Sequence, residues 1–256
     1  MIDDPLFLAL AVPAVLIVGI SKGGFGGGLG GVSVPLMALA VPPTLAVAVL
    51  APILCVMDLL SIAAWRGQWD RAILRILVPA AVVGVLLGAA TFSYFNDDQI
   101  RLIIGIIAAG FGLNHLLGGR LRRRRDGEGT PGRAPLSGAF WGTLGGFTSF
   151  VAHAGGPPVN VYLLARCLPR AVYQSTTVIY YVVLNYTKLV PYTLIGQFTP
   201  EVLWTAAALV PLAPVGIFLG VWMHRRMNDL WFYRVAHLFM LLTGLKLIGD
   251  GLHLWP

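Results

Sequence analysis

The stretch SKGGFGGGLGG at residues 21–31 consists mostly of glycine and has a lysine at its second position. The apolar segment LALAVPAVLIVGI precedes it, and the apolar segment VSVPLMALAV follows it. Glycine breaks helices because it adopts backbone conformations that are closed to other residues. The sequence therefore predicts a helix break that carries a charge and lies between two apolar segments.

The composition indicates a membrane protein. Hydrophobic residues make up 57% of the chain and charged residues 11%, against about 25% charged in an average soluble domain. Several apolar runs approach the roughly 20 residues that a transmembrane helix needs. These runs are continuous rather than alternating, so they predict an all-α, polytopic helical bundle in a lipid bilayer. The net charge of +7 resides largely in short loops, as orientation in a membrane requires, and indicates no nucleic acid.

The apolar segments fall into two sets separated by a basic loop. We expect helices at 6–20, 32–41, 43–65, 74–95, 102–118, 136–152, 157–165, 171–196, 202–223 and 231–249. The hydrophilic stretch between the two sets is rich in arginine. We therefore divide the chain into a first transmembrane repeat (1–118), a basic loop (119–134) and a second repeat (135–256).

The two halves share a glycine and proline pattern, which indicates an internal repeat. Gly23-Gly24-Phe25 recurs as Gly145-Gly146-Phe147. At a later, constant offset, three residues of one half match three of the other: Pro79, Gly84 and Gly88 correspond to Pro211, Gly216 and Gly220.

The distribution of arginine predicts how the halves are oriented. Arginines of the loop 119–134 place it in the cytoplasm, which puts the turn NDDQ at 96–99 outside. The equivalent turn in the second half, MHRRMND at 223–229, is basic and belongs inside. Equivalent loops on opposite faces predict two inverted repeats, an architecture common among secondary transporters. As helices, the segments 32–41 and 157–165 would be about half as long as the membrane's hydrocarbon core is thick. Whether they belong to re-entrant hairpins or to full spans stays open.

The glycine-rich stretch has a counterpart, FVAHAGGPPVN at 150–160. Irregular backbone is tolerated at membrane depth only where protein covers it or where it lines a cavity. Half-helices that start at such breaks offer free N–H groups at a positive dipole end, which suits an anion. Inverted symmetry predicts that the two stretches meet near the midplane.

These two stretches and the basic loop between hydrophobic halves resemble the TauE/SafE family of sulfite and organosulfur-anion exporters. The resemblance spans the whole chain and implies transport of small sulfur-containing anions such as sulfite, thiosulfate or organosulfonates. It also implies that Gly24, Gly26, Gly27 and Gly28 are motif positions. The second stretch departs from a plain glycine pattern at Ser149, His153 and Pro157-Pro158. The substrate-binding residues we predict are Lys22, Gly24, Gly26, Gly27, Gly28, His153, Gly155, Gly156 and Asn160.

Three of these side chains have alternative interpretations. Lys22 pairs with a substrate anion or extends to the membrane interface. His153 donates to an oxyanion or carries a proton, or it only packs between helices. Asn160 is a substrate ligand or an N-cap.

Ionisable and polar residues within the apolar segments form a second group of candidates. Asp58 lies in mid-segment, where an ionisable group is costly and functional by default. It carries a coupling proton or forms a buried ion pair with Lys188. Gln174, Thr177, Tyr181 and Asn185 recur at helical spacing, so we expect them on one face, lining a pathway.

We therefore expect a secondary transporter of the bacterial plasma membrane, with export as the favoured direction, and no enzyme. Its partners are a small anionic substrate and the bilayer, and the sequence indicates no metal and no cofactor. An anion channel is the main alternative, and an integral membrane enzyme is a weaker one. Whether the protein forms a homo-oligomer is left open.

Overall fold

The computed structural model describes residues 4–27, 30–67, 69–92, 94–121, 134–164, 166, 168–226 and 229–254, and all of their regular structure is helical. The first half contains α1 (Pro5–Gly24), a 3₁₀ turn η1 (Gly30–Val32), α2 (Ser33–Met37), α3 (Pro43–Ala64), α4 (Arg71–Phe92) and α5 (Asp97–Leu121). The second half contains α6 (Ala134–Ala152), α7 (Gly156–Leu164), α8 (Arg170–Leu194), α9 (Pro200–Leu209), α10 (Leu212–Arg226) and α11 (Asp229–Gly251). The prediction of an all-α bundle is confirmed.

Among the described residues, three helices are long and apolar enough to cross a membrane, and a bent pair makes a fourth candidate. The three are α1, α3 and α4, with 20, 22 and 22 residues, and at 1.5 Å per residue each reaches about 30 Å. The pair α9 and α10 is bent by 43°. The sequence predicted one segment at 202–223, and the structure divides it next to Pro211, where the ring removes a backbone donor and favours a kink.

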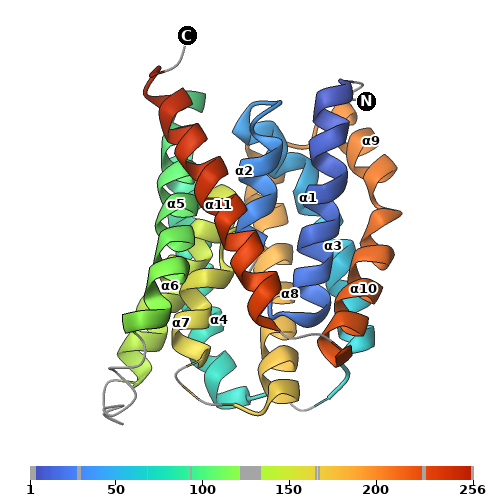
Figure 1. Cartoon of the computed structure of the whole chain (residues 1–256), viewed down its shortest axis with the longest axis vertical. Coiled ribbons are helices and arrows are strands. Elements are labelled where there is room, and N and C mark those ends of the chain that lie inside the picture. Colours follow the sequence, from blue (N-terminus) through green and yellow to red (C-terminus); the bar gives the residue numbers. More distant parts are fainter. Residues whose placement is uncertain are drawn as a thin grey trace.

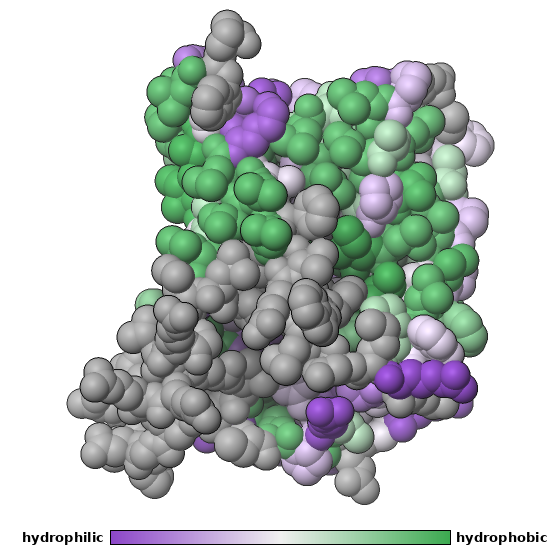
Figure 2. All heavy atoms as spheres, viewed as in Figure 1, coloured by the Kyte–Doolittle hydropathy of each residue, from purple (hydrophilic) through white to green (hydrophobic). Residues whose placement is uncertain are grey.

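Hydrophobic side chains cover much of one face of the bundle. Figure 2 shows a broad apolar band across the visible face, with hydrophilic residues gathered toward its two ends. The exposed side chains of this kind include Leu86, Leu87, Val190, Trp204 and Phe218. A band of this width suits contact with lipid tails.

Three helix pairs have the most extensive packing among the described residues: α1 with α10, α4 with α6, and α5 with α11. Glycines permit the close approach, as is common between membrane helices. A Cβ added to Gly19 would lie 2.9 Å from the Cα of Gly216. Gly146 of α6 similarly faces the carbonyl oxygen of Ala81 on α4.

Gly146→Ala is therefore expected to destabilise the protein, because the new methyl group meets backbone that cannot move away. Overpacking of this kind costs about 1–3 kcal/mol. Gly110→Ala is the matched control, since a Cβ on this α5 glycine meets nothing within 4 Å. The measurement is the unfolding temperature of both variants in detergent. Equal unfolding temperatures would contradict the packing described for α4 and α6.

The first helix ends later than the glycine content predicted, whereas α6 ends at Ala152 as expected. We expected the first helix to end at residue 20, but α1 continues to Gly24. Gly23 and Gly24 remain helical because they face the backbone of Ile217 and Gly220 on α10. Positive φ angles appear only after the helix ends, at 62° for Gly26 and 66° for Gly27.

Each break joins a long helix to a short one. In the first half the 20-residue α1 is followed by η1 and the five-residue α2. In the second half the 19-residue α6 is followed by the nine-residue α7. After the end of α6, His153 takes a positive φ of 50°. We call residues 21–30, from the last turn of α1 to the start of η1, the first break, and residues 149–155, from the last turn of α6 up to α7, the second break.

Candidate functional site

The carboxyl end of α1 is held by side chains from three other helices or their ends. The carbonyl oxygen of Lys22 accepts from Gln174 Nε2 at 2.8 Å. Trp65 Nε1 donates to the Gly23 oxygen at 2.7 Å, and His224 Nδ1 bonds the Gly24 oxygen at 2.6 Å. These bonds satisfy carbonyl groups that a helix end leaves without partners. The first break is thus fixed in place by its surroundings.

Gln174 also fixes the backbone beyond the helix end. Its Oε1 accepts from the N–H of Gly26 at 2.8 Å, so one side chain bonds the backbone before and after the end of α1. The next residue, Gly27, lies against the ring of Tyr181. A side chain at Gly27 would therefore meet this ring as well as a backbone φ that favours glycine.

The second break is stabilised in a comparable way. The N–H of Ala154 donates to the Thr148 carbonyl at 3.1 Å, and Thr148 Oγ1 donates to the Ala154 carbonyl at 3.0 Å. The ring of His153 reaches across to α3, where Nε2 lies 3.0 Å from the Val47 carbonyl oxygen. A carbonyl oxygen only accepts, so Nε2 carries the proton.

Lys22 and Asp58 form a buried ion pair between α1 and α3. Their side chains are 6% and 1% exposed, so Lys22 does not extend to the membrane interface as one interpretation predicted. The other carboxylate oxygen of Asp58 accepts from Asn185 Nδ2 at 2.7 Å. The partner predicted for Asp58 was Lys188, and that prediction is wrong.

Lys188 is bound to the second break instead. Its Nζ lies 3.1 Å from the Ser149 carbonyl oxygen, 3.0 Å from Ser149 Oγ and 2.8 Å from His153 Nδ1. Because Nε2 of His153 carries the ring proton, Nδ1 is an acceptor, and three acceptors match the three N–H groups of an ammonium. Lys188 is 1% exposed, and all three of these acceptors are uncharged.

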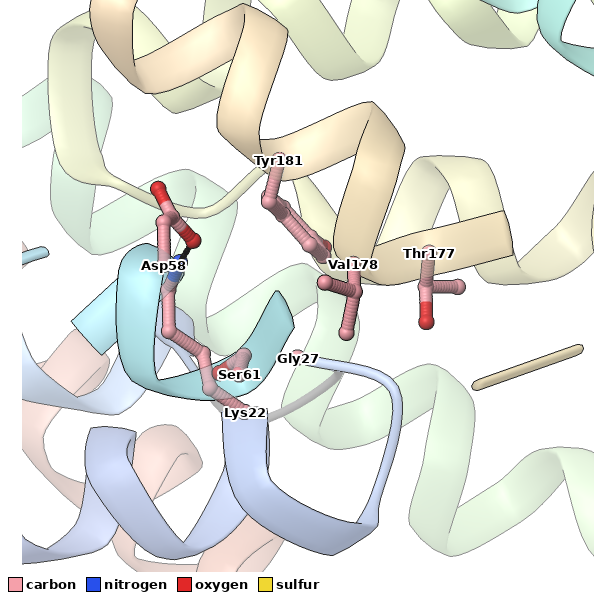
Figure 3. A pocket seen from close by; sticks show the side chains of 7 residues that line it. All are labelled: Lys22, Gly27, Asp58, Ser61, Thr177, Val178 and Tyr181. Atoms are coloured by element: carbon pink, nitrogen blue, oxygen red, sulfur yellow. Dashed lines mark hydrogen bonds and ion pairs between the residues drawn. The ribbon is translucent and has the colours of Figure 1, made fainter. Parts of the chain in front are cut away.

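Two small cavities adjoin Lys22. The first lies between Lys22, Asp58 and α8, and Figure 3 shows Lys22 reaching toward Asp58 beside Gly27 and Ser61. The second is bordered by both breaks, through Lys22, Gly27 and Gly30 on one side, Ser149 and His153 on the other, and Asn185 of α8. Each has a volume of about 10 Å³, close to the space that one water molecule needs. The two breaks therefore meet around one site, which has room for about one water molecule in each cavity.

A family model described as sulfite exporter TauE/SafE matches residues 11–247 of the chain. This chain belongs to the TauE/SafE family. The match includes both breaks and every charged residue described above. Members of this family are membrane transporters of sulfur anions and not enzymes. No curated protein and no solved structure matches the chain.

In this TauE/SafE protein, the polar stripe of α8 lies on one buried face and consists of Gln174, Thr177, Tyr181 and Asn185. Thr177 and Tyr181 border the first cavity, and Tyr181 and Asn185 border the second. The ring centroid of Tyr181 is 5.1 Å from Lys22 Nζ, a distance at which a cation and an aromatic ring attract. Gln174 belongs to the same face and contacts the first break. A role in the pathway stays a prediction.

Other predicted residues of the TauE/SafE protein lie outside this arrangement. Asn160 is within α7 and accepts from the Tyr173 hydroxyl at 2.7 Å, so the N-cap interpretation is wrong. Gly24 packs on α10, and Gly28 falls outside the described residues.

The start of α7 differs from the half-helix that the sequence predicted. Gly155 lies against Gly145 and Ser149, and Gly156 begins the helix. Pro157 and Pro158 follow, and proline has no N–H. The start of α7 therefore offers fewer free N–H groups to an anion than expected, which leaves the lysines as the main source of positive charge.

Sequence reasoning missed Trp65 and His224, which bind the carbonyl groups of α1. An aromatic residue and a histidine near the ends of apolar segments are typical of membrane interfaces. Their sequence context alone gave no signal of this contact. Ser149 was noted only as a departure from the glycine pattern, yet it supplies two of the three acceptors around Lys188.

Proposed function

We propose that this protein is a secondary transporter that exports a small sulfur-containing anion, such as sulfite, thiosulfate or an organosulfonate, across the bacterial plasma membrane. The observation that carries the proposal is the surroundings of Lys188. This buried lysine is bound by uncharged groups, while the carboxylate of Asp58 is paired with Lys22.

A buried cation without a counter-charge is costly inside a membrane protein. An anion that binds beside Lys188 would supply this counter-charge. The second cavity opens beside Ser149 and His153, which contact Lys188 directly. Lys188, Ser149, His153 and Asn185 are accordingly the residues that we assign to the substrate.

The inverted repeat remains part of the proposal, and helix packing supports it. If α6 corresponds to α1 and α10 to α4, the pairing of α1 with α10 becomes that of α6 with α4. Both pairs are among the most extensively packed of the described helices. The paired helices α3 and α8 would then correspond to each other and lie on the axis between the halves.

The helix ends give a register for the repeat. Gly27 N donates to Ser21 O, and Ala154 N donates to Thr148 O, both at 3.1 Å and both in the bonding pattern of a helix C-terminus. This register gives an offset of 127, which is also the separation of Asp58 and Asn185. It replaces the sequence alignment of Gly23 with Gly145.

At this offset the two lysines occupy exchanged positions. Lys22 of α1 corresponds to Ser149 of α6, and Ser61 of α3 corresponds to Lys188 of α8. Lys22 and Ser61 border one cavity, while Lys188 bonds Ser149. In each half, one of the two corresponding helices carries the lysine and the other carries the serine. The lysine lies on α1 in the first half and on α8, the counterpart of α3, in the second half.

The proposed orientation places the starts of α5 and α9 outside the cell and the end of α10 inside. In Figure 1 the starts of α5 and α9 lie at the upper end of the bundle and α10 ends at the lower end. His253 follows α11, and its Nε2 lies 3.4 Å from Oδ2 of Asp98 near the start of α5. The end of α11 therefore lies on the same side of the bundle as the start of α5.

Single cysteines on a cysteine-free background test this orientation. We expect a membrane-impermeant maleimide added to intact cells to label cysteine at Gln99 and at Gln197. Cysteine at Arg226 should react only after the cells are opened. Labelling of positions 197 and 226 from the same side would contradict the proposed topology.

Export requires no coupling ion in a cell that is negative inside. Moving an anion out of such a cell releases about 2.3 kcal/mol per charge per 100 mV of membrane potential. Cavities of this small size fit a carrier that moves its substrate through an occluded state, because a channel needs a continuous path.

The test is the uptake of radiolabelled sulfite into proteoliposomes with a potential that is positive inside. We expect uptake that saturates with sulfite concentration and exceeds that of protein-free vesicles. Uptake that rises linearly with concentration would indicate a channel. Uptake equal to that of protein-free vesicles would contradict transport of sulfite.

A further inference from the structure

The buried cluster, defined as Lys22, Asp58, Ser149, His153, Asn185 and Lys188, fixes the charge of the substrate it can take. With both lysines protonated and the carboxylate ionised, Lys22 and Lys188 each contribute one positive charge and Asp58 contributes one negative charge. His153 is neutral, because Nε2 donates to Val47 while Nδ1 accepts from Lys188. Among the described residues of the cluster, the sum is one surplus positive charge.

The neighbouring titratable groups do not change this sum. Cys55 precedes Asp58 by one helical turn on α3, and Tyr181 lies over Lys22. A thiol and a phenol are both neutral at physiological pH in their ordinary states. The surplus charge therefore belongs to Lys188, on the side of the second break.

We propose that the transporter selects monoanions, namely hydrogensulfite and organosulfonates, over dianions, because one negative charge neutralises the buried cluster. This inference rests on the proposed function and narrows its substrates, since thiosulfate is a dianion. A monoanion beside Lys188 gives an electroneutral complex that can be occluded between the breaks. A dianion at the same place leaves one uncompensated negative charge in a buried site, which is as costly as the uncompensated lysine.

Asp58 sets this selectivity in the proposal, without contacting the substrate. Its carboxylate cancels the charge of Lys22. Asp58→Asn keeps the shape of the side chain but raises the surplus to two positive charges. The variant should therefore favour dianions. Lys22→Met combined with Asp58→Asn removes both charges and returns the surplus to one.

Methanesulfonate and sulfate are the probes for this proposal. Both are tetrahedral about sulfur and similar in size, and near neutral pH the first is a monoanion and the second a dianion. Each is added as a competitor of radiolabelled sulfite uptake into proteoliposomes. For the wild type we expect methanesulfonate to compete about tenfold better than sulfate, which corresponds to about 1.4 kcal/mol.

The variants separate charge from shape. Asp58→Asn should reverse the order, with sulfate the better competitor, and the double variant should restore the preference for methanesulfonate. Equal competition by the two probes in the wild type, or an unchanged order in Asp58→Asn, would overturn the proposal. If Asp58→Asn does not fold, the comparison of methanesulfonate with sulfate in the wild type still tests the proposal. A wild type that takes up no sulfite would refute the proposed function itself, whereas uptake with sulfate as the better competitor refutes only the charge selection.

Discussion

Lys188→Met is expected to lower sulfite transport by about a hundredfold, which corresponds to roughly 2.7 kcal/mol of lost interaction with the anion. Methionine keeps most of the length and the apolar part of the side chain but has no charge. The uncharged acceptors Ser149 and His153 then face no cation. Sulfite flux into proteoliposomes at equal protein incorporation measures the effect.

The matched control is Lys246→Met. Lys246 is 55% exposed on α11 and pairs with Asp250 on the same helix, and exposed pairs of this kind contribute little. We expect wild-type flux from it. The unfolding temperature of Lys188→Met should not fall, since the variant removes a buried charge that has no counter-charge among its bonded partners. Wild-type flux in Lys188→Met would show that the lysine does not bind substrate.

Asp58→Asn is expected to destabilise the protein by about 3–5 kcal/mol, because it leaves Lys22 buried without its counter-charge. Lys22→Met added to Asp58→Asn should restore most of this loss, since the pair is then removed as a whole. The measurement is the unfolding temperature of the single and double variants in detergent.

A second double variant distinguishes the two lysines. Lys188→Met added to Asp58→Asn should restore no stability beyond what Lys188→Met gives alone, because Lys188 bonds the second break and not Asp58. If Lys188→Met rescues Asp58→Asn and Lys22→Met does not, Asp58 pairs with Lys188 and the described pairing is wrong.

Much of the arrangement could be predicted from the sequence. The apolar segments predict the helices, and the glycine-rich stretches predict breaks after α1 and α6. Asp58 was a candidate because an ionisable residue is costly in an apolar segment. The polar stripe from Gln174 to Asn185 follows helical spacing and so lies on one face of α8.

The pairing of charges could not be predicted in the same way. Asn185 lies opposite Asp58, and Lys188 follows it by about one helical turn of 5.4 Å along α8. That displacement carries Lys188 to the second break, where Ser149 and His153 accept its hydrogen bonds. Spacing along one helix does not reveal which side chain of another helix lies at the same height.

Tertiary packing also decided where the first helix ends. Local propensity predicts a break as soon as glycines accumulate. Gly23 and Gly24 are nevertheless helical, because α10 approaches them closely and their carbonyl oxygens bind Trp65 and His224. These partners lie far away in the sequence, so no local pattern could identify them.

Equilibrium binding of sulfite to the purified protein in detergent, measured by titration calorimetry, tests the central claim most directly. The account predicts one sulfite bound per chain in the wild type and in Lys246→Met. It predicts no measurable binding in Lys188→Met at the same concentrations. Binding of sulfite to Lys188→Met with the wild-type affinity would contradict an anion site at Lys188.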